Sequence, residues 1–143
     1  MKIVHTLLII LLFSFNSFAK NNKGSEDMFY ISFGEKEISC QFAESKAAEE
    51  LKEILAKGAI TINMENYGGF EKVGELPKKL TKNDESISAS SGDILLYQEK
   101  YMVIMFGSNS WSYTRLGKIK GLSSSEIYNI LSKAGNNIKV YMK

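Results

Sequence analysis

Three residues of the segment "SWSYTR" (110–115) have side chains and a spacing suited to binding a ligand. Trp111, Tyr113 and Arg115 alternate with small polar residues, so all three project from one face if the chain is extended. Trp111 is the only tryptophan and Arg115 the only arginine. A guanidinium can hold a carbonyl or carboxylate with two hydrogen bonds and stack on an aromatic ring, which lysine cannot do. The segment predicts a binding surface. The alternative is a structural clasp, in which Arg115 stacks on one of these rings and pairs with a buried carboxylate such as Glu65.

A second group of candidate ligand-binding residues lies beside the glycine pair of "ENYGGFEKVGELPKKL" (65–80). The glycines and the single proline predict a long irregular connection, and such connections often carry function in compact domains. We expect Glu65 and Tyr67 at the rim of a groove whose floor is formed by the three residues of "SWSYTR". Asn109, just before that segment, is a further candidate. The glycine pair matches no nucleotide-binding loop with its lysine.

The histidine and cysteine content excludes most hydrolytic chemistries. The only histidine, His5, lies in an N-terminal apolar segment, and Cys40 is the only cysteine. The rest of the chain cannot build a Ser-His-Asp triad, a Cys-His dyad or a usual zinc site. A single cysteine forms no intramolecular disulfide. We expect no cofactor and no metal. Cys40 alternates with apolar residues in a strand pattern, which predicts a buried and unreactive thiol.

The first 19 residues are typical of a secretory signal peptide. Lys2 gives a basic start, and the apolar run "TLLIILLF" (6–13) is well short of the roughly 20 residues that a membrane-spanning helix needs. Small residues precede a cleavage site after Ala19. The sequence therefore predicts an exported protein, periplasmic or secreted, with a flexible lead-in at 20–27 and one domain at 28–143.

The charge balance excludes two classes of partner. Removal of residues 1–19 takes away Lys2 and leaves 17 basic against 16 acidic residues, a net charge of about +1. Such a chain offers no basic face for nucleic acid and no polybasic patch for a membrane surface. We therefore expect no nucleic-acid partner and no membrane association after signal removal. The expected state is a monomer whose partner is a peptide segment or a small-molecule ligand.

Period-two alternation of apolar residues predicts a mainly β domain. One hairpin joins "MFYISF" (28–33) to "ISCQF" (38–42), and another, with strands apolar on both faces, turns at Glu99-Lys100. The strand that carries Trp111 should bend or bulge near Gly117, where its alternation breaks. Further strands are expected at 60–64, in "SISASSGD" and at 138–142.

Two helices are expected among these strands. The first runs from about Ser45 to Lys57, with an inward apolar stripe and Gly58 at its end. The second begins after Ser123, which forms a capping box with Glu126. Many antiparallel strands with two helices indicate a closed antiparallel β-barrel whose ends are covered by the helices.

Three segments are similar to the bacterial cyclophilin-like domain. They are "MENYGGFEKVGELP" (64–77), "GDILLY" (92–97) and "FGSNSWSYTRLGKI" (106–119), and the similarity extends over residues 28–143 in the same order. The resemblance implies a cyclophilin-like barrel of about eight antiparallel strands capped by two α-helices. This agrees with the order of the predicted elements.

The resemblance also bears on activity. Cyclophilins isomerise Xaa-Pro peptide bonds with an arginine that hydrogen-bonds the prolyl amide, in a pocket that also holds phenylalanine, glutamine and histidine. This chain has no histidine after residue 19 and lacks an arginine-containing strand before "GGF", and Arg115 stands elsewhere. We therefore predict a module that binds a peptide or small ligand without a defined reaction. The alternative is a peptidyl-prolyl cis-trans isomerase in which Arg115 is catalytic.

Overall fold

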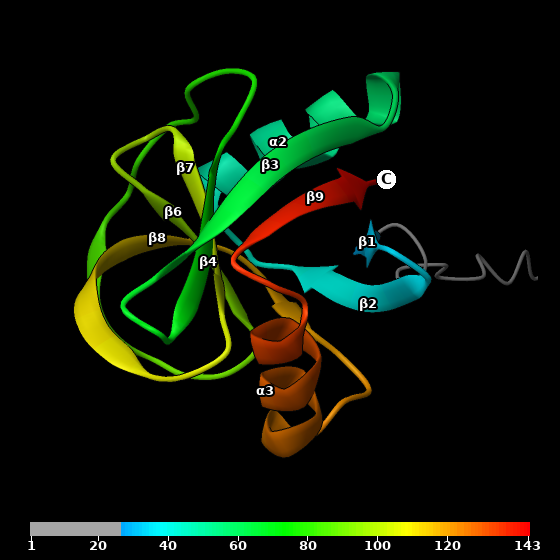
Figure 1. The fold of residues 1–143 in the computed structure, drawn as a ribbon. Helices are drawn as coiled ribbons and strands as arrows, with labels where there is room; N and C mark the ends of the chain where they lie inside the picture. The colour runs from blue at the N-terminus through cyan, green and yellow to red at the C-terminus, as the bar shows by residue number, and fades with distance from the viewer. Residues whose placement is uncertain (1–26) are drawn as a thin grey trace, which may run out of the picture.

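The computed structural model describes residues 27–143 (Figure 1). The predicted signal peptide (1–19) and the lead-in as far as residue 26 lie outside this range. No helix within the range is long and apolar enough to cross a membrane. The described elements are, in chain order, β1 (Met28–Phe33), β2 (Lys36–Phe42), α2 (Lys46–Lys57), β3 (Ile60–Tyr67), β4 (Glu71–Glu75), β5 (Glu85–Ala89), β6 (Asp93–Tyr97), β7 (Tyr101–Met105), β8 (Asn109–Ile119), α3 (Ser124–Lys133) and β9 (Asn137–Met142).

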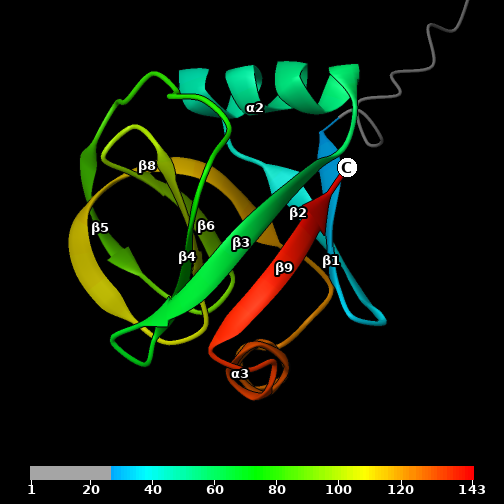
Figure 2. The same cartoon turned by 45° about the horizontal axis from the view of Figure 1, so that its top comes forward.

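Eight antiparallel strands close into a ring. Their order is β2-β1-β9-β3-β4-β7-β6-β8, and the ring closes because β8 also pairs with β2. Strand β5 pairs with β8 alone and is not part of the ring. Helix α2 lies across one end of the ring and α3 lies at the opposite end (Figure 2). The mainly β class and the closed antiparallel barrel capped by two helices are confirmed.

Strand β8 connects the ring to β5. Its first half pairs with β5, its middle with β6 and its last three residues with β2. Arg115 lies opposite Leu95 and Gly117 lies opposite Ile94, so Leu116 is an additional residue in the ladder. This confirms the predicted irregularity near Gly117. Because a bulge bends the strand and increases its twist, the first half of β8 can leave the ring and cover its outer face.

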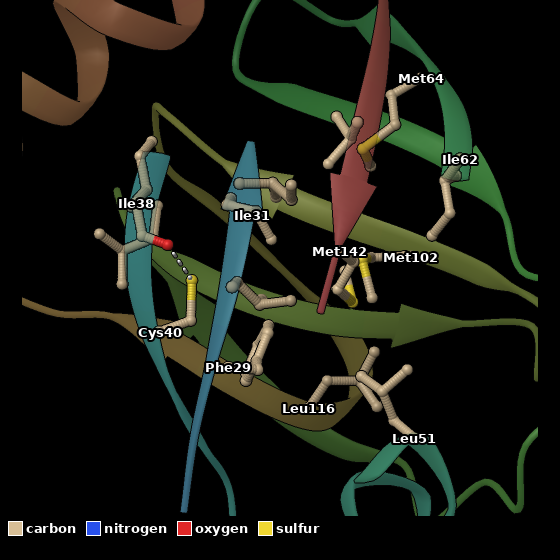
Figure 3. Packing of buried hydrophobic residues seen from close by; sticks show 14 of the residues in the cluster. Phe29, Ile31, Ile38, Cys40, Leu51, Ile62, Met64, Met102, Leu116 and Met142 are labelled. Carbon is tan, nitrogen blue, oxygen red and sulfur yellow. Dashed lines mark hydrogen bonds between the residues drawn. The ribbon is translucent and has the colours of Figure 1, made fainter. Parts of the chain in front are cut away.

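The interior of the ring is filled by apolar side chains from the strands and from α2 (Figure 3). Ile31, Leu51 and Met64 are fully buried there. Cys40 is also fully buried, with Sγ 3.8 Å from the carbonyl oxygen of Ile38. Burial raises the pKa of the Cys40 thiol to about 12. The predicted buried thiol is confirmed, and it stays protonated at any physiological pH.

A second apolar cluster lies on the outer side of β6 and β7. It contains Leu95, Val103 and Met105, together with Ile87 of β5 and Tyr113 of β8. Their neighbours in sequence on β6 and β7 point into the ring and belong to the interior core. These two strands are therefore apolar on both faces, as predicted, because β5 and the first half of β8 cover their outer face.

The two helices have the predicted ends. Ser45 caps α2, with its side-chain oxygen accepting a hydrogen bond of 3.0 Å from the backbone N–H of Ala48. Ser123 and Glu126 form the complete capping box of α3. Ala48 and Leu51 of α2 and Ile127 of α3 are buried against the ring ends.

The predicted irregular connection over 65–80 is wrong for residues 65–75, whereas residues 76–80 do lie in the irregular segment between β4 and β5. Strand β3 continues to Tyr67, and β4 begins after only three intervening residues and pairs with it. Gly68 and Gly69 have φ of +61° and +71°, the conformation that suits a tight turn between two strands. Alternation was hidden because Glu71 and Lys72, on opposite faces of β4, are both buried although both are charged residues.

Candidate ligand-binding site

A pocket of about 410 Å³ lies on the outer side of the ring, between the first half of β8 and the strands β4, β6 and β7. We call it the aromatic pocket, because five of its eight lining residues are tyrosine or tryptophan. The lining residues are Tyr67, Glu71, Val73, Tyr97, Tyr101, Asn109, Trp111 and Tyr113. Its volume lies within the usual range for small-molecule sites, roughly 300–1,000 Å³.

Strand periodicity brings the walls of the pocket together. Asn109, Trp111 and Tyr113 alternate along β8 and therefore share one face. Glu71 and Val73 alternate along β4 in the same way. Two tyrosines, at positions 97 and 101, face each other across the β6–β7 hairpin, and Tyr67 lies opposite Glu71 across the β3–β4 hairpin.

The aromatic rings differ in their exposure. Tyr113 is 3% exposed, and its ring centroid lies 6.2 Å from that of Tyr97 in an edge-to-face arrangement. Trp111 and Tyr67 are 58% and 67% exposed, although both line the pocket. Large aromatic side chains that stay exposed beside a hollow are typical of a binding surface. The pocket thus has a buried wall and an accessible aromatic rim.

A buried carboxyl group, that of Glu71, lies in this pocket. Glu71 is only 6% exposed, and the hydroxyl of Tyr113 donates a hydrogen bond to Oε2 of Glu71 over 3.5 Å. The amide Nδ2 of Asn109 donates in turn to the hydroxyl oxygen of Tyr113 over 3.0 Å. Burial raises the pKa of Glu71 to about 6, and the Tyr113 hydrogen bond offsets part of this rise. Burial also raises the pKa of Tyr113.

Glu71 has no basic partner in the described part of the chain. None of the ion pairs among residues 27–143 involves its carboxyl group. The lining contains no lysine, arginine or histidine. Lys100, in the β6–β7 turn beside the lining residue Tyr101, lies with Nζ 4.8 Å from the ring centroid of Tyr101, and it pairs with Glu75 over 3.6 Å. Within residues 27–143, no basic side chain therefore balances the charge of Glu71.

The structure brings four of the six predicted site residues together. Tyr67, Asn109, Trp111 and Tyr113 line the aromatic pocket. Glu65 is exposed on β3, opposite the lining residue Val73, and does not line the pocket itself.

Arg115 lies outside the aromatic pocket. Its Nε donates to Oε1 of Glu85 on β5 over 2.7 Å, and both side chains are about half exposed. Its pairing partner is thus Glu85 and not Glu65. It contributes to a separate small hollow beside Phe42 and Asp93. Arg115 lies two residues beyond Tyr113, the last pocket residue of β8, and its guanidinium is held there by Glu85, the first residue of β5.

Sequence reasoning missed Glu71 and the two tyrosines of the β6–β7 hairpin. Tyr97 and Tyr101 flank the predicted turn at Glu99-Lys100, and their closeness to it on either side is the signal that could have placed them side by side. Glu71 offered no such signal, because it lay within the segment predicted to be irregular.

Other hollows in residues 27–143 offer less chemistry. The largest of those described here, about 720 Å³, lies between the β1–β2 turn and α3, and its lining combines apolar side chains with Glu35 and several lysines. No ionisable residue of that lining is buried. Within the same range, no three His, Cys, Asp or Glu side chains gather as a metal site would require.

The family of the chain follows from its sequence match. Residues 31–143 match the model of the Cyclophilin-like family. This chain belongs to the cyclophilin-like family. The cyclophilin-like domain is also similar to the solution structure of a hypothetical protein from Archaeoglobus fulgidus, with a TM-score of 0.61 and 17% sequence identity over 86% of this chain and 98% of the other. That similarity supports the fold alone. No curated protein matches the chain.

Proposed function

We propose that this cyclophilin-like protein is an exported binding module that holds a peptide segment or a small-molecule ligand in the aromatic pocket. The observation that carries the proposal is the position of Glu71, a buried carboxyl group with no basic partner among the described residues, inside a pocket walled by aromatic rings. A few polar groups among aromatic side chains are typical of small-ligand sites. Export is supported by the signal-peptide pattern of residues 1–19.

Binding is favoured over prolyl isomerisation because the arginine is engaged elsewhere. The Nε of Arg115 is held by Glu85 at 2.7 Å, whereas the pocket presents a carboxyl group and tyrosine hydroxyls. A prolyl isomerase needs a strong donor directed at the prolyl amide to stabilise the twisted transition state. An Xaa-Pro isomerisation assay tests this alternative. Measurable activity that Arg115→Lys abolishes would favour the enzyme over the binding module.

Binding can be measured through Trp111, the only tryptophan of the chain, which lines the pocket. We expect peptides or fragments that occupy the pocket to change its fluorescence and to shift the NMR signals of neighbouring lining residues. Val73→Phe should block binding because it fills the hollow from β4. The control is Thr61→Phe, which adds the same ring at an exposed position of β3 outside the pocket. If no ligand in a broad screen shifts the lining residues, the proposed function is wrong.

Export has its own test. The full-length protein, expressed in a bacterium with a secretory pathway, should reach the periplasm or medium. N-terminal sequencing should then begin at Lys20, directly after the predicted cleavage site. Retention of residues 1–19 on a cytoplasmic product would contradict export.

A further inference from the structure

The chemistry of the aromatic pocket also indicates the charge of its ligand. Glu71 is the only carboxylic acid in the described lining, which contains no basic side chain and is otherwise made of tyrosines, tryptophan, valine and asparagine. An ionised carboxylate that is taken out of water without a counter-charge is costly. Its protein partner is a single hydroxyl, that of Tyr113, at 3.5 Å. A positively charged ligand group would supply the counter-charge that the protein does not.

The aromatic rings favour the same kind of ligand. The face of an aromatic ring carries partial negative charge and attracts cations, and groups of such rings recognise alkylated ammonium ions. Here four tyrosines and Trp111 surround the hollow. One of them already makes such a contact, because Nζ of Lys100 lies 4.8 Å from the ring centroid of Tyr101.

We propose that the aromatic pocket binds an alkylammonium group, whose positive charge meets the Glu71 carboxylate while its methylene or methyl groups contact the faces of the tyrosine and tryptophan rings. This inference rests on the proposed function and specifies its ligand. A pocket of about 410 Å³ accommodates a group the size of a lysine side chain or a small free amine. Both carry the same chemistry.

Other ligand classes fit less well. An anion would meet the Glu71 carboxylate, with no lysine, arginine or histidine in the lining to balance it. A neutral apolar ligand would remove the remaining water from Glu71 and leave the carboxylate without a counter-charge. A neutral hydroxyl ligand could donate one hydrogen bond but would lack the attraction between a positive charge and the ring faces.

The experiment compares probes that share a shape and differ in charge. The purified protein is titrated at pH 7.5 with n-butylammonium, 1-butanol and butyrate in separate experiments. Calorimetry and the NMR signals of the lining residues report binding in each titration. We expect n-butylammonium to bind at least about tenfold more tightly than 1-butanol, and butyrate to bind more weakly still. Glu71→Gln should remove the preference for the cation, and Glu53→Gln, which neutralises an exposed glutamate of α2, should retain it.

A second measurement needs no variant. With a pKa of about 6, Glu71 is about one-tenth ionised at pH 5, so affinity for n-butylammonium should fall about tenfold between pH 7.5 and pH 5. The side chains that face Glu71 are Tyr113 of β8, Tyr67 of β3 and Met105 of β7. None of these residue types changes charge in this interval, and affinity for 1-butanol should not fall, because protonation of Glu71 removes no interaction that a neutral ligand needs.

The outcomes separate the two proposals. Equal binding of n-butylammonium and 1-butanol, or a preference for butyrate, would overturn the cation inference and leave the binding function intact. Failure of the cation to bind while another ligand from the screen occupies the pocket would do the same. Failure of every ligand would overturn both. Nα-acetyl-lysine-N-methylamide distinguishes the sources, since tighter binding than n-butylammonium indicates a lysine of a peptide and weaker binding a free amine.

Discussion

Replacing Glu71 with glutamine should stabilise the ligand-free protein at neutral pH. The pKa of this carboxyl group rises from 4.5 to about 6 on folding because the group is buried. The sign follows from linkage: a carboxyl group whose pKa is raised in the folded state favours folding least when it is ionised. The contribution of Glu71 to folding stability is therefore greatest below pH 4.5, where the group is protonated, and is lost as pH rises through about 6. The difference corresponds to about 2 kcal/mol, at about 1.4 kcal/mol per tenfold change in proton affinity.

The assay is urea unfolding of the wild-type protein and of Glu71→Gln at several pH values from 4 to 8, with circular dichroism as the readout. The difference in unfolding free energy between the two proteins cancels the titration of all other carboxyl groups, provided that these are independent of Glu71. This difference should shift by about 2 kcal/mol in favour of the variant between pH 4 and pH 8. Glu53→Gln should show no such shift, because this glutamate is exposed on α2. A difference that is constant with pH, or that shifts in favour of the wild type, would refute the reasoning.

Three further changes test the framework around the pocket. Arg115→Lys loses the 2.7 Å bond from Nε to Glu85. Because this pair is exposed, the free energy of unfolding in urea should fall by less than about 1 kcal/mol, and ligand binding should not change. A large loss of stability or of binding would contradict our placement of Arg115. Gly74→Ala would put a Cβ 2.5 Å from the carbonyl oxygen of Asn63, so the unfolding free energy should fall by about 1–3 kcal/mol. An unchanged midpoint of urea unfolding would show that β3 and β4 can separate locally to make room. Ser123→Ala removes the capping box of α3 and should cost about 1 kcal/mol by thermal or urea unfolding, whereas no cost would mean that this end of α3 contributes little to stability.

The barrel was predictable because its strands follow simple periodicity. Alternation located the β1–β2 and β6–β7 hairpins, and capping residues located both helices. The β3–β4 hairpin was missed because β4 buries a charged residue on each face. Lys72 is fully buried, with its ammonium group donating to the carbonyl oxygen of Gly135 and lying 5.8 Å from the ring centroid of Phe106. Long-range partners of this kind are not visible in a local pattern.

The candidate site was predictable only in part, for a related reason. The period of β8 correctly placed Trp111 and Tyr113 on one face, and Asn109, a separate candidate, shares that face. The same period suggested Arg115 as well, but the pocket ends at Tyr113 and Glu85 of β5 holds the Arg115 guanidinium outside it. Which residues face the first half of β8 depends on how β5 and β8 fold back over the ring, and this is a property of the tertiary structure.

The two expected effects of Glu71→Gln have opposite signs, and this contrast distinguishes a ligand-binding residue from a structural one. A residue that holds the fold together should lower stability when it is replaced, and should leave affinity unaffected unless the fold changes. Glu71 contributes an unbalanced charge to the folded state, so its loss should raise stability while it removes the preference for a cation. Binding sites often retain groups that are unfavourable in the free protein because the ligand compensates for them. A gain in stability together with a loss of cation binding would therefore identify Glu71 as a residue whose role is to meet the ligand.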